Sequence, residues 1–453
     1  MLFNIITSGE WILGAGLSYC QIIGVAYFLL KRNYHTALVL HFIFFVSSVN
    51  FSFVDSNTLD ELSTNYSKLK FFGYFPISFI ISVWLAIAYI KAPNFVYIRS
   101  FLSQTIFLIL VATFLGVLGI LFSSHSVHYF IFYLYYSVSV FLFLFIFSRA
   151  INKYNLRFWR YMVVLNLIAS GFTSLLMYLF GLSTSYGGIS IIPYNSIFIF
   201  TPLLLFVPFQ KNILLWIIAI IAIGFVSIFS IGGKGVAFMV LILILFFVKQ
   251  LKRTSIIYIC IFSFLILIIQ NNFFTQFTEG RSDLLSLHKF GQFFSIFNFS
   301  ASNADTLEGI SDSPKVRIAE IVNIANMYIS SPVFSVFGLG FGAGFQDYSG
   351  LFKLMDLSKG AFDDGQINSG IFYRPHDTIP VVLLLHGLAG LIFILYWSIY
   401  FILNHKKSAL FLGGIPWLFL TYGFDLNIAF FGTLCVVLGF LESFILEQDN
   451  NAT

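Results

Sequence analysis

Long apolar runs separated by short turns make up the chain before residue 271 and after residue 378. A membrane-crossing helix needs about 20 mostly apolar residues. Runs near this length fall at 11–30, 36–54, 71–90, 101–122, 129–148, 161–181, 196–210, 213–230, 236–250, 254–272, 379–403, 408–424 and 428–446. Only 9% of residues are charged, against roughly 25% in soluble domains. We therefore expect an all-α polytopic integral membrane protein with about 12 to 13 transmembrane helices and one large external loop.

The positions of Lys and Arg predict how these helices are oriented, because cytoplasmic loops carry the excess of both. Alternate turns hold Lys31, Arg32, Lys91, Arg99, Arg149, Lys153, Arg157, Arg160, Lys211, Lys249, Lys252, Arg253, Lys406 and Lys407. The turns between them hold only Lys68, Lys70 and Lys234. This alternation places the N-terminus and the polar loop 271–378 outside. No internal repeat or soluble domain boundary interrupts the pattern, so we expect one integral-membrane domain over residues 1–453.

The loop 271–378 contains a predicted helix that carries charge. Ser313 followed by Pro314 favours a helix start, and Pro332 favours its end. The apolar residues Ile318, Val322, Ala325 and Ile329 fall on one helical stripe. Arg317 and Glu320 stand three positions apart and are neighbours on such a helix. Either they form a surface ion pair, or Arg317 contacts a phosphate, which its planar guanidinium fits well.

A glycine run follows that helix, with glycine at every second position from Gly338 through Gly340 and Gly342 to Gly344. Glycine permits left-handed backbone and close approach of another group. Such a run can form an anion-binding nest of backbone N–H groups. It lacks the lysine and the strand–helix setting of a phosphate-binding P-loop. Gly338 and Gly340 are therefore secondary candidates for contact with an anionic ligand.

The tetrapeptide Arg374-Pro375-His376-Asp377 lies just before the run that begins near Ile379. Its side chains should therefore sit at the outer membrane–water boundary. Histidine is a common general base, and Asp377 either orients the imidazole or caps the next helix. The alternative is an ordinary surface histidine.

Lys234, within Ser230-Ile231-Gly232-Gly233-Lys234-Gly235, is the other charge at this boundary. Ionisable groups at the membrane are candidates for function, although a lysine there can also extend its amine into water. No spacing of carboxylates, histidines or cysteines is typical of a metal site. We expect no metal and no cofactor. The net charge of +5 reflects membrane topology, and no nucleic-acid partner is expected.

The order of these motifs resembles the O-antigen polymerase and O-antigen ligase superfamily. The resemblance covers roughly residues 195–390 and rests on five short motifs in sequence. They are Ser230 to Lys234, the helix with Arg317, Ser331-Pro332 with Gly338-x-Gly340-x-Gly342, His376-Asp377, and Gly387-Leu388-Ala389-Gly390. Two positions depart from the family: Lys234 stands where it usually has Arg, and Asp377 where it has Asn. Lysine keeps the charge but cannot make a bidentate phosphate contact.

The resemblance implies a glycosyltransferase C-type architecture and glycosyl transfer at the outer face of a bacterial cytoplasmic membrane. Its substrate would be an oligosaccharide on undecaprenyl diphosphate, with the bilayer and a chain-length regulator membrane protein as partners. Arg317, Lys234 and Arg374 would neutralise the diphosphate, with no metal, and His376 would take the acceptor proton. Asp377 and Glu320 would be secondary site residues.

Two related activities and one unrelated activity are compatible with these motifs. The resemblance favours the polymerase of lipid-linked repeats, because polymerases are the more divergent members and this chain departs from the ligase-like motifs. The first alternative is the ligase that transfers the glycan to lipid A-core. The second is a transporter or flippase of lipid-linked sugars, a class in which repeated halves are common. No matching halves are visible here.

Overall fold

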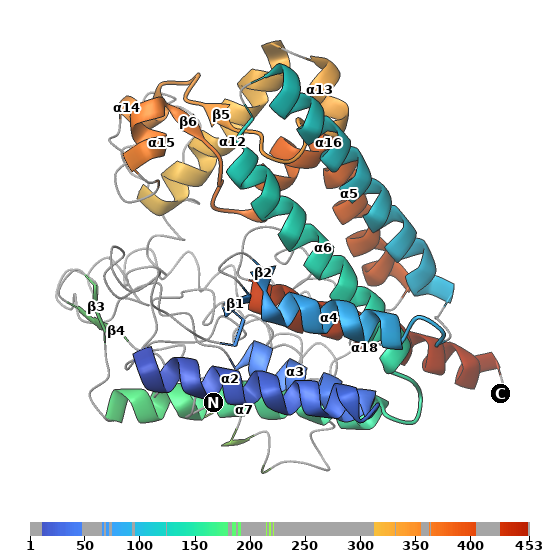
Figure 1. Ribbon diagram of the computed structural model, residues 1–453. Helices are drawn as coiled ribbons and strands as arrows, with labels where there is room; N and C mark the ends of the chain where they lie inside the picture. The colour runs from blue at the N-terminus through green and yellow to red at the C-terminus, as the bar shows by residue number, and fades with distance from the viewer. Residues whose placement is uncertain are drawn as a thin grey trace, which may run out of the picture. The chain divides into compact units, whose positions relative to one another are not determined.

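The structure is a computed structural model (Figure 1). It describes residues 11–47, 66–67, 69–71, 75–92, 96–123, 125–179, 184–186, 189–191, 214, 217–218, 221, 312–330, 332–354, 362, 364–404 and 426–451. These residues are mostly helical, and three of their helices are long and apolar enough to cross a membrane. They are Ile98–Phe122, Val127–Ala150 and Thr378–Tyr400. This agrees with the expected helical membrane protein, whereas the span count and the glycosyltransferase C-type architecture stay predictions.

Contacts within the chain divide it into two compact units, residues 1–85 with 154–298 and residues 86–153 with 299–453. We describe each unit by itself. The single domain expected over residues 1–453 stays a prediction.

The first unit contains α2 (Trp11–Leu30), α3 (Tyr34–Val46), most of α4 (Ile77–Ala88) and α7 (Leu156–Leu179). A tight turn joins α2 to α3, and Asn33 Oδ1 caps α3 by accepting from the Thr36 backbone N–H at 3.2 Å. His41 is buried between Tyr66 Oη at 2.7 Å and Ser82 Oγ at 3.0 Å. These hydrogen bonds join α3 to α4 inside the unit.

Two short antiparallel strand pairs also belong to this unit, β1 (Lys70–Phe71) with β2 (Phe75–Pro76) and β3 (Thr184–Tyr186) with β4 (Ile189–Ile191). The first pair corrects the helix expected from residue 71, because α4 begins only at Ile77. Pro76 explains the delay, since proline is unfavourable inside a helix.

The second unit is built around α5 (Val96–Phe122), α6 (Val127–Ala150) and α16 (Thr378–Asn404). Apolar side chains of α5 point outward along its length, with Leu110, Phe114 and Leu121 all more than 60% exposed. Such a surface is typical of a lipid-facing span. The last helix, α18 (Leu426–Asn451), packs on α6, where the rings of Phe430 and Phe143 lie 4.1 Å apart.

A cap of residues 312–377 covers one end of the α5, α6 and α16 bundle (Figure 1). Its elements are α12 (Asp312–Ser330), α13 (Pro332–Phe337), β5 (Phe345–Gln346), α14 (Leu351–Leu354), α15 (Asp364–Ser369) and β6 (Ile371–Phe372). β5 and β6 pair antiparallel, with Phe345 opposite Phe372. Phe352 and Phe362 surround Phe372, with ring centroids 5.0 and 4.5 Å away, so aromatic rings form the core of the cap.

The charged helix of the loop exists as predicted, but its apolar stripe is not its packed face. The helix runs over Asp312–Ser330, and Pro332 opens α13. Its buried side includes Val316, Ala319, Glu320 and Asn323, whereas Ile329 is 77% exposed. Polar and apolar side chains therefore share the buried face of α12.

Arg149, in the last turn of α6, closes the end of α4 at the bundle end opposite the cap. Its Nη1 donates to the carbonyl oxygens of Tyr89 at 3.3 Å, Ala92 at 3.0 Å and Ile90. Its guanidinium carbon also lies 4.2 Å from the ring centre of Phe145. These three carbonyls lie in the turn that follows α4, so Arg149 holds this turn against the end of α6.

Candidate functional site

Two ion-pair contacts join α12 to the residues that lead into α16. Arg317 Nε lies 2.6 Å from Asp377 Oδ2, and His376 Nδ1 lies 2.5 Å from Glu320 Oε1. Arg317 and Glu320 are one turn apart on α12, while His376 and Asp377 are consecutive. Each element thus contributes one basic and one acidic side chain. We call these four residues the polar cluster.

Glu320 is the buried member of the polar cluster, with 0% of its surface exposed. Its two carboxylate oxygens accept from the backbone N–H of His376 at 3.1 and 3.0 Å, and Oε1 also contacts the imidazole. A buried carboxylate is costly without such hydrogen bonds. A carboxylate on Nδ1 favours the tautomer in which Nε2 is the basic nitrogen. Glu320 therefore fixes both the main chain and the ring of His376.

The polar cluster corrects two interpretations of the sequence. Glu320 is not part of a surface ion pair, because it is fully buried and contacts His376. Asp377 does not orient the imidazole, because Glu320 does and the Asp377 carboxylate lies on Arg317. The backbone carbonyl of Asp377 accepts from the Val381 N–H at 3.2 Å, so Asp377 stands at the start of α16.

The segment before His376 is anchored to α6. Tyr133 Oη donates to the carbonyl of Tyr373 at 2.8 Å, and the Tyr373 N–H donates to Gln366 Oε1 at 2.8 Å. Gln366 Nε2 in turn donates to Tyr129 Oη at 3.1 Å. Burial raises the pKa of the Tyr373 phenol, so this group stays protonated at neutral pH. The sequence held no signal for Gln366 in this position.

Arg374 is exposed, and its guanidinium lies over the ring of Phe132 on α6, 4.7 Å from the ring centre. A cation over an aromatic face is held in place by the ring quadrupole. Arg374 therefore lies beside the segment that carries His376, with its charge on the surface of the cap.

Residues 338–341 of the glycine run do not form an anion nest, and this corrects the prediction for Gly338 and Gly340. Gly338, Gly340 and Gly342 all have positive φ angles, from 76° to 82°. Four consecutive N–H groups donate to protein carbonyls: Gly338 to Phe334 at 2.8 Å, Leu339 to Leu384 at 3.0 Å, Gly340 to Leu385 at 3.1 Å and Phe341 to Ala112 at 2.9 Å. Because these donors are engaged, Gly338 and Gly340 serve close packing instead of ligand binding.

Helix α16 is interrupted where the glycine run meets it. Gly387 has φ 61° and ψ −154°, which are not helical angles. A Cβ added to Gly387 would lie 2.5 Å from Gly338 N and 2.6 Å from Ser335 O. The carbonyls of Leu384 and Leu385 bind the glycine run, and Tyr328 Oη donates to that of Leu383. The cap thus supplies the hydrogen bonds near the interruption.

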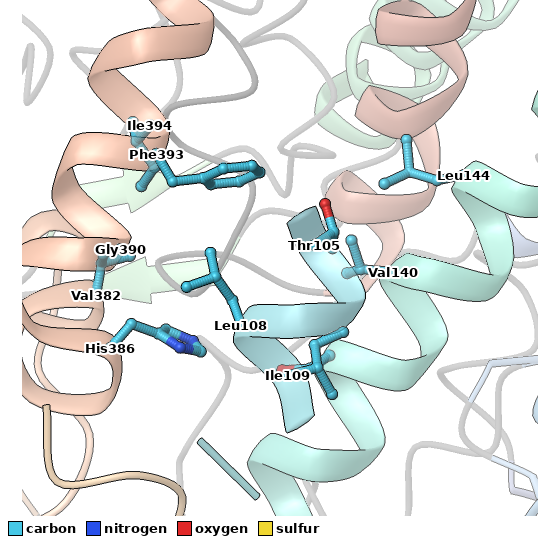
Figure 2. A pocket seen from close by; sticks show the side chains of 11 residues that line it. Thr105, Leu108, Ile109, Val140, Leu144, Val382, His386, Gly390, Phe393 and Ile394 are labelled. Carbon is cyan, nitrogen blue, oxygen red and sulfur yellow. The ribbon is translucent and has the colours of Figure 1, made fainter. Parts of the chain in front are cut away.

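A small cavity between α5, α6 and α16 lies within the bundle (Figure 2). His386, Leu108 and Phe393 line it together with Ser137 and Thr105. Its volume of about 50 Å³ holds a few water molecules, whereas small-molecule pockets usually reach roughly 300–1,000 Å³. We therefore do not assign a binding site for a large ligand to this cavity.

Lys234 lies outside the described residues, so its distance from the polar cluster is not defined. Among the residues that the structure does describe, no group of three or more His, Cys, Asp or Glu side chains could hold a metal ion. Comparison with family models, curated proteins and solved structures finds no match to this chain.

Proposed function

We propose that the protein is a membrane glycosyltransferase that polymerises undecaprenyl-diphosphate-linked oligosaccharide repeats into O-antigen or a related surface polysaccharide. The observation that supports this proposal best is the polar cluster. Arg317 and His376, which the motif order singles out from positions 59 residues apart, belong to one group of contacting side chains. That group lies where a cap meets helices of membrane-crossing length.

In the proposed reaction, an acceptor hydroxyl attacks the anomeric carbon of the lipid-linked sugar chain. The new glycosidic C–O bond forms as the bond from the anomeric carbon to the diphosphate oxygen breaks. The diphosphate leaves with the bonding electron pair and remains attached to the lipid. The proton of the attacking hydroxyl passes to Nε2 of His376 and then to water.

The residues of the polar cluster have distinct roles in this proposal. Arg317 stabilises the negative charge that develops on the leaving diphosphate, the kind of electrostatic contribution that is often the largest. Arg374 and Lys234 are further candidates for stabilising the negative charge on the leaving diphosphate. Glu320 acts through His376, because its carboxylate holds the ring and stabilises the imidazolium that forms. Glu320 is thus a positioning residue.

Glycan formation by the purified protein, reconstituted in vesicles with lipid-linked repeats, tests the proposal. We expect polymer to form and His376→Ala to abolish most of the activity. Full activity of His376→Ala would contradict the role of this residue. Loss of activity on adding a chelator would contradict the expectation of metal-independent transfer, and transport without polymer would favour a flippase.

A deletion strain separates the polymerase from the ligase. Loss of a polymerase leaves lipopolysaccharide core that carries a single repeat, whereas loss of a ligase leaves core without any repeat. Gel electrophoresis of the lipopolysaccharide distinguishes these products, and we expect the single repeat.

A further inference from the structure

The contacts of the glycine run with α5 show how far along the bundle this part of the cap reaches. A Cβ added to Gly340 would lie 2.4 Å from Gly116 N and 2.6 Å from Ala112 O. Gly116 and Ala112 precede the end of α5 at Phe122 by 6 and 10 residues. At 1.5 Å per residue, Gly340 lies about 9–15 Å below the end of that helix.

Helix α16 gives a second and independent measure of this depth. Leu339 and Gly340 donate to the carbonyls of Leu384 and Leu385, and Gly338 packs against Gly387. These partners follow the start of α16 at Thr378 by 6 to 9 residues. The corresponding depth is about 9–14 Å, in agreement with the value from α5.

Between this depth and the cap end of the bundle, the helices expose apolar side chains. On α5, Val117 and Leu121 are 42% and 67% exposed, and on α6, Val127 and Ile131 are 54% and 58% exposed. If water reached the level of Gly340, all four of these apolar side chains would be exposed to water. About 20 residues of a helix span the hydrocarbon layer. Counting 20 residues back from Leu121 along α5 leads close to Arg99, whose charge suits the opposite membrane surface. The layer therefore extends beyond Gly340.

The cap surface at this level is also apolar. Phe334, Val336 and Phe337 of α13 are 43%, 47% and 44% exposed, and Ile329 at the end of α12 is 77% exposed. No charged residue occurs from residue 321 to 346. On α16, which α13 contacts, the apolar residues Ile379, Leu388 and Ile392 are 52%, 46% and 63% exposed. The exposed face of α13 thus borders the exposed face of a membrane-length helix.

Non-helical backbone is tolerated at membrane depth only where protein satisfies its polar groups. The N–H groups of residues 338–341 meet this condition, because each donates to a carbonyl of α13, α16 or α5. Glycine at positions 338 and 340 allows the close approach that these hydrogen bonds need.

We propose that α13 and residues 338–341 form a re-entrant segment of the membrane domain, in which Phe334, Val336 and Phe337 contact lipid acyl chains. Part of the loop expected to be wholly external is then embedded in one leaflet. This role is independent of the proposed glycosyl transfer, and it applies equally to a protein without enzymatic activity.

Spin labels test this arrangement in the full chain reconstituted in lipid vesicles. Cys20, Cys260 and Cys435 are first replaced by alanine, and single cysteines are then introduced as Phe334→Cys or Val336→Cys. Phe114→Cys on α5 is the lipid-exposed control, and Tyr348→Cys in the cap, where Tyr348 is 55% exposed, is the water-exposed control. We expect labels at 334 and 336 to collide with oxygen more than with a water-soluble nickel complex, as at 114.

Nickel accessibility at 334 and 336 equal to that at 348 would overturn the proposal. The unmodified protein provides a second measurement if a cysteine variant does not fold. A carbene reagent dissolved in the acyl chains should label peptides of α13, and hydroxyl radicals generated in water should leave them unmodified. The reverse labelling pattern would exclude a re-entrant segment.

Discussion

The polar cluster and the glycine run both looked suited to an anionic ligand, yet they differ in how their polar groups are used. In the polar cluster, the Arg317, Asp377 and His376 side chains remain 34%, 35% and 33% exposed. In the glycine run, four consecutive N–H groups donate to protein carbonyls. The comparison teaches that three of the four charged side chains at this element boundary remain partly accessible, whereas the backbone donors of residues 338–341 serve the fold.

The largest effect is expected from Gly340→Ala, which tests the packing role of the glycine run. The positive φ of 81° costs an alanine roughly 1–3 kcal/mol, and overpacking against the α5 backbone adds roughly 1–3 kcal/mol. We expect the free energy of unfolding to fall by about 2–6 kcal/mol. Denaturant titration in micelles measures it.

Gly350→Ala is the matched control, because Gly350 has φ 70° but open space around its Cβ position. It carries only the backbone cost, roughly 1–3 kcal/mol. Equal losses in the two variants would show that close packing at Gly340 contributes little.

His376→Ala tests the polar cluster as a catalytic site. We expect the rate of polymer formation to fall by roughly 10²–10⁴-fold, the usual contribution of a general base. The assay uses purified protein in vesicles, and His128→Ala, which changes an exposed histidine of α6, should retain its activity. Equal losses of activity in the two variants would show that His376 does not act as the general base.

Glu320→Gln then sharpens that result, because it keeps the size of the side chain and removes its charge. If Glu320 positions His376, kcat should fall while KM for the lipid-linked repeat changes little. A change confined to KM would instead indicate that Glu320 only holds α12 against the start of α16.

Arg317 should contribute through charge and geometry together. We expect Arg317→Ala to lower kcat by roughly 10²–10³-fold, as for loss of one group that stabilises developing charge. Arg317→Lys should lose less activity, because it retains the charge without the planar fork. Equal activities of the two variants would show that the charge of Arg317 is not used.

Asp377→Asn should have the smallest effect. Half-exposed ion pairs contribute roughly 0.2–1 kcal/mol, so stability should change by less than about 1 kcal/mol. A diphosphate must compete with Asp377 for Arg317, so KM should fall by up to about fivefold, which corresponds to about 1 kcal/mol. A rise in KM would show that Asp377 helps to bind the substrate.

The sequence predicted those features that depend on local patterns. Apolar runs predicted α5, α6 and α16 to within a few residues, and Ser313-Pro314 predicted the start of α12 to within one residue. The pairing of Glu320 with His376 was not predictable, because 56 residues separate them and Arg317 offered a nearer partner. The interruption at Gly387 was not predictable, because Gly387 and Gly390 lie in an apolar run whose sequence does not show that residues 335–338 pack against it.

Arg149 has a consequence for experiments on orientation. It is one of the charges predicted to lie on the cytoplasmic side of the membrane, and it also donates to three carbonyls beyond the end of α4. Replacing it to invert the chain would remove these three hydrogen bonds while altering the insertion signal. A charge substitution at Arg149 would therefore not distinguish misfolding from inverted insertion. Lys153, which follows α6, is a better position for testing the orientation of the chain.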